Sequence, residues 1–178
     1  MTAAEEPSPS TAAHRSDAAL RPGARCVVLT ISDSRTEATD ESGALIEQLL
    51  LGAGHGVVVR HLLPNDDAQI RSRLVEALGR ADVDAVLCTG GTGLGLRDRS
   101  VEVVRPLLER ELPGFGELFR LLSYLEQVGA AAMLSGALAG VSRGKFVVVM
   151  PGSRAAVELA MTRLLLPELK HALRELQR

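Results

Sequence analysis

The chain of 178 residues carries a formal net charge of −2, is 46% hydrophobic and is only 2% aromatic. Its length fits one domain with an aliphatic core, and the near-neutral charge and scarce aromatic rings argue against nucleic-acid binding, which uses basic surfaces and stacking platforms. No apolar run approaches the roughly 20 residues of a membrane span, and the N-terminus lacks the apolar segment of a secretory signal, so we expect a cytoplasmic protein with neither membrane nor nucleic-acid partners.

The N-terminal residues 1–22 are rich in Ala, Ser, Pro and Glu and show no hydrophobic periodicity. A segment of this composition buries too little apolar surface to offset its loss of chain entropy on folding. We therefore predict a disordered tail over 1–22, as an inert extension rather than a partner-binding arm. The domain is expected to occupy residues 23–178.

The first half of this domain alternates between strand and helix patterns. Residues 25–31 (RCVVLTI) are almost continuously apolar, as in a strand that is covered on both faces. Apolar residues at helical spacing predict a helix over 41–51, which the glycines after it end. Strands are predicted at 57–63 and 85–88, and a helix that ends at Gly79 lies between them.

The next segments predict helices and one short strand. Residues 101–110 carry Val and Leu on one side of a predicted helix. Pro113 opens a second helix, since proline suits the first helical position. The apolar side chains of that second helix belong either to the core or to a subunit interface, with the core as the default. Residues 130–142 are rich in small side chains, and we interpret them as a short helix followed by a short strand.

The chain then returns to the strand–helix pattern. Residues 145–150 (KFVVVM) predict a buried strand, and Ser153 is a candidate N-cap of the following helix. Pro167 is expected to start the final helix, which runs through Leu176. Strands that alternate with helices of about 10 to 15 residues favour parallel βαβ units. The predicted fold belongs to the α/β class and is a single domain of three layers with a mostly parallel sheet.

Ligands of such sheets bind beyond the carboxyl ends of the strands. Four polar or glycine-rich segments are expected at that edge: SDSR at 32–35, PNDD at 64–67, TGGTGLGLRD at 89–98 and PGS at 151–153. Within SDSR, Asp33 is a candidate binding residue, although Asp and Ser are also common turn formers. Several such segments at one edge indicate a ligand site more strongly than any one of them.

The most informative segment is the run TGGTG, made of Thr89, Gly90, Gly91, Thr92 and Gly93. Its glycines permit positive φ and a close approach of the backbone to a ligand. Consecutive backbone N–H groups and the following helix N-terminus favour a bound phosphate. The run matches neither GxGxxG nor GxxxxGK[ST], so a P-loop nucleoside triphosphatase is disfavoured. The alternative is that the glycines only make a tight strand–helix connection.

Two charged residues follow the glycine run. Asp98 is the best candidate for a metal ligand, although a carboxylate at a helix start is also favoured by the helix dipole. Arg97 is either a phosphate partner or a solvated surface charge. The histidines and cysteines share no spacing that indicates a metal site, and no hydrolytic triad is indicated.

Several segments, in this order and spacing, resemble the MogA/MoaB molybdopterin-binding family, which includes a domain of gephyrin. They are ISDSR, DESG, TGGTG with Arg97-Asp98, PGFGELFRLLS, LSGALAGV and MPGS, and the resemblance covers residues 25–169. Membership implies the MogA/MoaB-like fold and a homotrimer or higher homo-oligomer. It also implies that molybdopterin binds as substrate, and that active members adenylylate its terminal phosphate with ATP and Mg²⁺.

The same resemblance assigns candidate roles to residues. Asp98 occupies a catalytic and metal-binding position. The ligand-binding positions are Asp33, Thr89 to Gly93, Arg97, Ser123, Ser135, Pro151, Gly152 and Ser153.

This chain also departs from the family pattern. The family's catalytic aspartate directly follows a proline, but here Pro64 is followed by Asn65, and Asp66 comes one residue later. Asn65 and Asp66 are therefore both catalytic candidates, with Asp66 as the alternative metal ligand. Many members have Ser-Arg where this chain has Ser135-Gly136. These departures support an alternative function, that of a catalytically weak or inactive pterin-binding or regulatory member.

Overall fold

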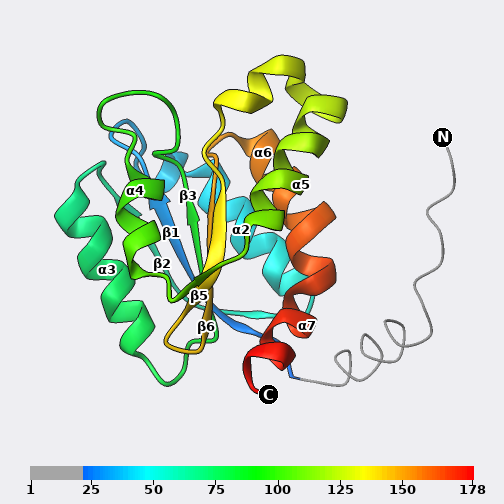
Figure 1. Ribbon diagram of the computed structural model, residues 1–178. Helices are drawn as coiled ribbons and strands as arrows, with labels where there is room; N and C mark the ends of the chain where they lie inside the picture. The colour runs from blue at the N-terminus through cyan, green and yellow to red at the C-terminus, as the bar shows by residue number, and fades with distance from the viewer. Residues whose placement is uncertain (1–21) are drawn as a thin grey trace, which may run out of the picture.

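A six-stranded sheet separates two layers of helices (Figure 1). The structure is a computed structural model that describes residues 22–178, so the tail predicted over 1–22 lies outside the described residues except for Pro22. The strand order is β2-β1-β3-β6-β5-β4. Within the described residues no helix has the length and apolar character that crossing a membrane requires.

The sheet is mostly parallel, as predicted. β1 pairs in parallel with both β2 and β3, and β3 pairs in parallel with β6. β5 is antiparallel to β6, and β4 is antiparallel to β5. The strands are β1 (Arg25–Ile31), β2 (Gly56–Leu63), β3 (Ala85–Thr89), β4 (Arg110–Glu111), β5 (Leu138–Ser142) and β6 (Lys145–Met150).

The helices bury one side each against the sheet. One layer packs α2, α5, α6 and α7 around a large cluster that includes Ile46 and Phe119, and the other packs α3 and α4 around Ile70 and Val104. Their bounds are α2 (Glu41–Gly52), α3 (Asp67–Gly79), α4 (Ser100–Val104), α5 (Pro113–Ser123), α6 (Arg154–Leu159) and α7 (Leu166–Leu176). The three-layer arrangement predicted from the alternating pattern is confirmed.

One sequence-based prediction of helix extent is wrong. The helix expected over 101–110 ends at Val104 and continues as a 3₁₀ turn that contains Pro106, because proline lacks the N–H that a longer α-helix needs. The chain then forms β4, whose two exposed residues carry no strand pattern. The prediction that Pro167 starts the final helix is confirmed, since α7 begins at Leu166 with Pro167 as its second residue, and a π-helical segment, Ala160–Leu165, joins α6 to α7.

The two cysteines lie in different parts of the core. Cys26 in β1 and Cys88 in β3 are both fully buried and unpaired. Burial raises the pKa of each thiol to about 12, and the thiolate is the reactive form. We therefore expect a thiol-specific disulfide reagent at pH 8 to modify neither cysteine in the native protein and both in guanidinium chloride. Rapid modification of the native protein would contradict this packing.

Candidate functional site

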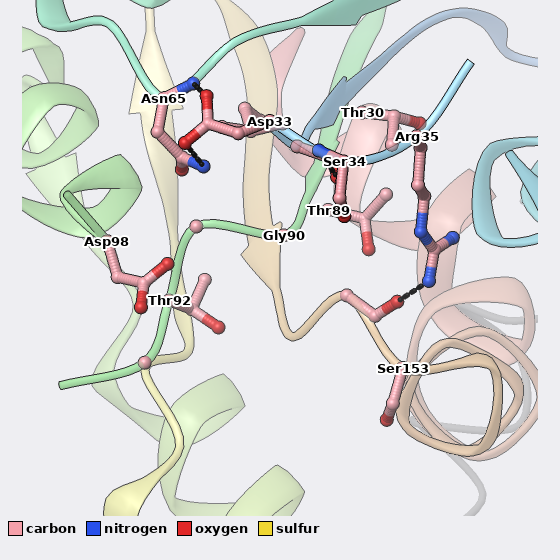
Figure 2. A pocket seen from close by; sticks show the side chains of 15 residues that line it. Thr30, Asp33, Ser34, Arg35, Asn65, Thr89, Gly90, Thr92, Asp98 and Ser153 are labelled. Atoms are coloured by element: carbon pink, nitrogen blue, oxygen red, sulfur yellow. Dashed lines mark hydrogen bonds between the residues drawn. The ribbon is translucent and has the colours of Figure 1, made fainter. Parts of the chain in front are cut away.

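The described residues contain a pocket of about 520 Å³ at the carboxyl ends of the parallel strands. All four segments predicted at this edge contribute to it: the loop after β1, Asn65 after β2, the glycine run after β3, and the loop after β6 (Figure 2). The site is therefore assembled from positions that are far apart in sequence and that the parallel sheet brings to one edge.

The glycine run forms the floor of the pocket, and two of its glycines are required by geometry. Gly90 has φ +93°, and a Cβ there would lie 2.2 Å from the carbonyl oxygen of Ile31. Gly91 has φ +60°, and a Cβ there would lie 2.6 Å from Asn65 Oδ1. Both the positive φ and the crowding exclude a side chain. The loop is thus a close-packed backbone surface, which suits a ligand that approaches main-chain N–H groups.

Hydrogen bonds to neighbouring segments hold the glycine run in place. The Thr89 hydroxyl donates to the carbonyl oxygen of Pro151 at 3.0 Å, and Gly90 N donates to Met150 O at 3.1 Å. The hydroxyl of the buried Ser100 donates to Gly90 O at 2.8 Å. Because these partners belong to β6, the loop after it and α4, the run is preformed by the fold.

Asp98 provides a carboxylate next to this loop. Its Oδ2 accepts a hydrogen bond from Gly95 N at 3.2 Å, and the side chain is half-buried and lines the pocket. A Cβ on Gly93 would lie 2.8 Å from the same oxygen, so glycine lets the carboxylate fold against the loop. Asp98 therefore places a carboxylate, a ligand type that Mg²⁺ accepts, beside the glycine run.

Asp33 and Asn65 both line the pocket and form a hydrogen-bonded pair. Asp33 Oδ1 accepts from Asn65 N at 2.9 Å, and Oδ2 accepts from Asn65 Nδ2 at 3.1 Å. Arg97 Nη2 lies 3.2 Å from Asp33 Oδ1. The backbone and side-chain N–H groups of Asn65, followed by the charge of Arg97, hold the pKa of Asp33 below its usual value. Asn65 thus acts as a donor to a neighbouring carboxylate in this structure.

The other side-chain atom of Asn65 has no such partner. Its Oδ1 is buried and, among residues 22–178, accepts no hydrogen bond. It faces the glycine run at Gly91, as the clash with a Cβ there shows. A buried acceptor without a donor costs about 1–3 kcal/mol. This oxygen is therefore a buried acceptor that the described residues leave unsatisfied next to the glycine run.

A cationic residue outside our predicted set also lines the pocket. Arg35 follows Asp33 in the loop after β1, and its guanidinium donates to Ser42 Oγ at 2.9 Å and to Gly152 O at 3.1 Å. It belongs to the segment ISDSR, which carries part of the family resemblance. A single arginine in a loop has no local sequence mark that separates it from a surface charge, so only its contacts identify it.

Several predicted site residues have other surroundings. Asp66 is the N-cap of α3, where its Oδ1 accepts from Gln69 N at 2.8 Å. Arg97 is largely exposed and contacts the site through Asp33. Ser123 is buried at the end of α5, Ser135 is half-buried, and neither lines the pocket. Pro151 does not line it either and offers its carbonyl oxygen to Thr89, whereas Gly152 and Ser153 do line it.

Gly136, where many family members carry arginine, packs against the glycine run. Its N–H donates to Thr92 O at 3.0 Å, and a Cβ would lie 2.8 Å from that oxygen. A longer side chain at this position would displace one of the two backbones. Glycine at position 136 therefore permits the close packing of the two segments, which an arginine side chain would disturb.

The residues present fit a magnesium ion only in combination with a ligand. Within residues 22–178, no three His, Cys, Asp or Glu side chains are arranged to hold a metal ion. Protein-bound Mg²⁺ commonly takes one or two carboxylates and completes its coordination with substrate phosphates and water. Asp98 provides such a carboxylate, and the unpartnered Asn65 Oδ1 is a neutral oxygen of the kind that Mg²⁺ accepts.

Comparison with known proteins identifies the family. A sequence model described as "Probable molybdopterin binding domain" matches residues 27–171. Molybdenum cofactor biosynthesis protein B of Halalkalibacterium halodurans is 55% identical over 152 residues, which are 85% of this chain and 89% of that protein.

Solved structures agree with this assignment. A crystal structure of a molybdenum cofactor biosynthesis protein B superposes with a TM-score of 0.86 at 48% identity, covering 89% of this chain and 99% of that one. The tungsten cofactor synthesizing protein MoaB from Pyrococcus furiosus superposes with a TM-score of 0.79 at 34% identity, with the same coverage of both chains. The family model, the relatives and the solved structures agree, and the chain belongs to the MogA/MoaB-like family of molybdopterin-binding proteins.

Proposed function

We propose that this protein acts in molybdenum cofactor biosynthesis by binding molybdopterin and adenylylating its terminal phosphate with ATP and Mg²⁺. The observation that carries the proposal is the pairing of a preformed glycine floor with the adjacent Asp98 carboxylate in one pocket. The names of the relatives, molybdenum cofactor biosynthesis protein B, support the same pathway.

The proposed reaction is an in-line phosphoryl-type displacement. An oxygen of the molybdopterin phosphate attacks the α-phosphorus of ATP, a new P–O bond forms, and the bond to the bridging oxygen of the β-phosphate breaks. Pyrophosphate leaves, and the product is the adenylylated pterin. Such transfers depend mainly on positioning and on neutralising charge.

Different residues of this chain are assigned to positioning the phosphates and to neutralising their charge. The backbone N–H groups of the glycine run hold a phosphate, and the rigid connection to β6 keeps them oriented. Asp98 would hold Mg²⁺, which when bound neutralises charge on the phosphates. Asn65 orients Asp33 through two hydrogen bonds.

One observation favours the alternative, a catalytically weak or inactive pterin-binding or regulatory member. Asn65 is neutral and is committed to Asp33, and Asp66 is committed to capping α3. Asp98 therefore has no second free carboxylate from this loop as a partner. A neutral ligand binds Mg²⁺ less strongly than a carboxylate does, which would slow transfer while leaving pterin binding intact.

The deciding experiment mixes the purified protein with molybdopterin, ATP and Mg²⁺ under anaerobic conditions. Chromatography of the released pterin and measurement of pyrophosphate detect adenylyl transfer. Adenylylated pterin with stoichiometric pyrophosphate supports the enzyme. Pterin binding without either product supports the binding member, and the absence of pterin binding contradicts both.

We also propose that the protein forms a homotrimer or a higher homo-oligomer. Helix α5 and the turns after it combine a buried side, which includes Phe119, with an exposed apolar side. The exposed side includes Leu118, Leu121, Tyr124, Leu125, Val128 and Met133. Several exposed apolar side chains on one helix and the segment after it are typical of a protein–protein contact. The buried side fits the core alternative for this helix, and we propose its exposed side as the subunit interface.

Light scattering tests this proposal directly. The wild-type protein should show a mass of three times 18.9 kDa or a higher multiple, and the double variant Leu121→Glu/Leu125→Glu should shift toward the monomer. Leu51→Glu is the matched control, because Leu51 is exposed to a similar degree but lies at the end of α2. A monomeric wild-type protein would contradict the proposal.

A further inference from the structure

The charges that line the pocket are unevenly distributed. Two carboxylates, Asp33 and Asp98, line it, whereas Arg35 is the single basic residue among the described residues that do so. The carboxylate of Asp33 already accepts a hydrogen bond from Asn65 and forms an ion pair with the largely exposed Arg97. A phosphate monoester carries a charge of about −1.5 to −2 at pH 7. A ligand with that charge therefore finds one direct cationic partner within the pocket lining.

The guanidinium of Arg35 is held in a defined orientation. Its Nη1 donates to Ser42 Oγ and its Nη2 to the carbonyl oxygen of Gly152, so the side chain joins the loop after β1 to the first turn of α2 and to the loop after β6. Gly152 in turn packs on the glycine run, since a Cβ there would lie 2.9 Å from Gly90 Cα. A planar guanidinium that is already ordered loses little conformational freedom when a ligand binds.

A buried carboxylate stands behind this arginine. Asp40 Oδ1 lies 3.7 Å from Arg35 Nη1. The oxygens of Asp40 also accept from Gly43 N and from the Thr30 hydroxyl, each at 2.9 Å. Asp40 is buried, whereas the Arg35 side chain is 29% exposed and faces the pocket. The carboxylate therefore supports the guanidinium from the protein side and leaves its other side to a ligand.

Arg35 still has donors to offer. A guanidinium carries five N–H groups, and within residues 22–178 its contacts to protein acceptors are two hydrogen bonds and the 3.7 Å ion pair with Asp40. Figure 2 shows Arg35 and Asp98 on opposite sides of the glycine run, with Arg35 turned away from Asp33. The pocket thus has a carboxylate end and a guanidinium end.

We propose that Arg35 is a specificity-determining residue that binds a phosphate group of the ligand at the guanidinium end of this pocket. The proposal rests on the proposed function, because it takes the ligand to be molybdopterin, ATP or both. The terminal phosphate of the pterin and a phosphate of the nucleotide offer the same chemistry to a guanidinium, and the experiment separates them.

The test measures equilibrium binding to Arg35→Gln, with Arg154→Gln as the matched control. Arg154 is an exposed arginine directly after Ser153 that does not line the pocket. The ligands are molybdopterin, molybdopterin freed of its phosphate by a phosphatase, MgATP and adenosine. A charged hydrogen bond is worth about 1.5–3 kcal/mol, so Arg35→Gln should weaken the phosphate-bearing ligand by about tenfold to hundredfold.

The pattern of losses decides the outcome. A loss for molybdopterin but not for its dephosphorylated form assigns the pterin phosphate to Arg35, and a loss for MgATP but not adenosine assigns the nucleotide. Equal losses with and without phosphate would show that Arg35 only maintains the loops, and a loss no larger than that of Arg154→Gln would also overturn the inference. Failure of the wild-type protein to bind either ligand contradicts the proposed function instead.

A second variant keeps the test usable if Arg35→Gln does not fold. Arg35→Lys retains the positive charge but cannot reproduce the two-pronged contact to Ser42 and Gly152. Its affinity for the phosphate-bearing ligand should fall less than that of Arg35→Gln, by about threefold to tenfold. Unchanged affinity for every ligand in a folded Arg35→Lys, together with no protection of wild-type Arg35 from a dicarbonyl reagent by ligand, would overturn the proposal.

Discussion

Replacement of Asp98 by Asn is expected to lower the rate of adenylyl transfer by about a hundredfold or more, while molybdopterin affinity changes by less than about threefold. The variant keeps the size of the side chain and can still contact Gly95, but it loses the only charge that this loop offers to Mg²⁺. Negative charge on the reacting phosphate oxygens is greatest in the transition state of the transfer. The loss of the Asp98 charge should therefore lower turnover rather than ground-state binding.

Single-turnover kinetics and equilibrium binding on the same preparation measure these two quantities. Glu102→Gln is the matched control, since Glu102 is an exposed acid in the first turn of α4 that does not line the pocket. It should leave both quantities unchanged. Equal losses of turnover and pterin affinity in Asp98→Asn would argue that Asp98 shapes the pocket instead of binding the metal.

The second large effect concerns Asn65. Asn65→Asp replaces the donor that lies 3.1 Å from Asp33 Oδ2 with an oxygen, so two carboxylates face each other. Without divalent ions we expect the melting temperature to fall by about 3 °C at neutral pH, because like charges at this distance repel. Mg²⁺ should restore it, and turnover in Mg²⁺ should rise by about tenfold as a carboxylate ligand is gained.

The effect of Asn65→Asp on stability should depend on pH. In the wild-type protein the pKa of Asp33 is lowered by Asn65, so its stabilising effect is present above the usual carboxyl pKa and is lost as the pH falls through the lowered value. Asn65→Asp should therefore differ most from wild type near neutral pH and least at low pH, where protonation relieves the repulsion.

Asn65→Ala separates the added charge from the lost hydrogen bonds. It removes the side-chain donor to Asp33 and introduces no carboxylate, so its melting temperature should not respond to Mg²⁺. Differential scanning calorimetry with EDTA or Mg²⁺ measures both variants. A Mg²⁺-independent Asn65→Asp would show that this position does not approach a metal site, and unchanged turnover would leave Asp98 without a catalytic partner at residue 65.

Much of the fold was predictable from local patterns. Continuous apolar runs such as residues 25–31 mark strands that are buried on both faces, because such strands need apolar side chains on both sides. Ser153 was predictable as a helix cap, since its side chain bonds only three residues along the chain. β4 was not, because it is two exposed residues whose strand conformation depends on pairing with β5.

The amino-acid pattern also located the site at the carboxyl ends of the strands, because the parallel connections send every such loop to one edge. It could not assign partners. Asn65 meets Asp33 across 32 positions, and Arg35 meets Gly152 across 117. Asp66 is equally acidic but caps α3 instead. These outcomes depend on the register and packing of distant segments, and a contact between such segments leaves no local signature in either one.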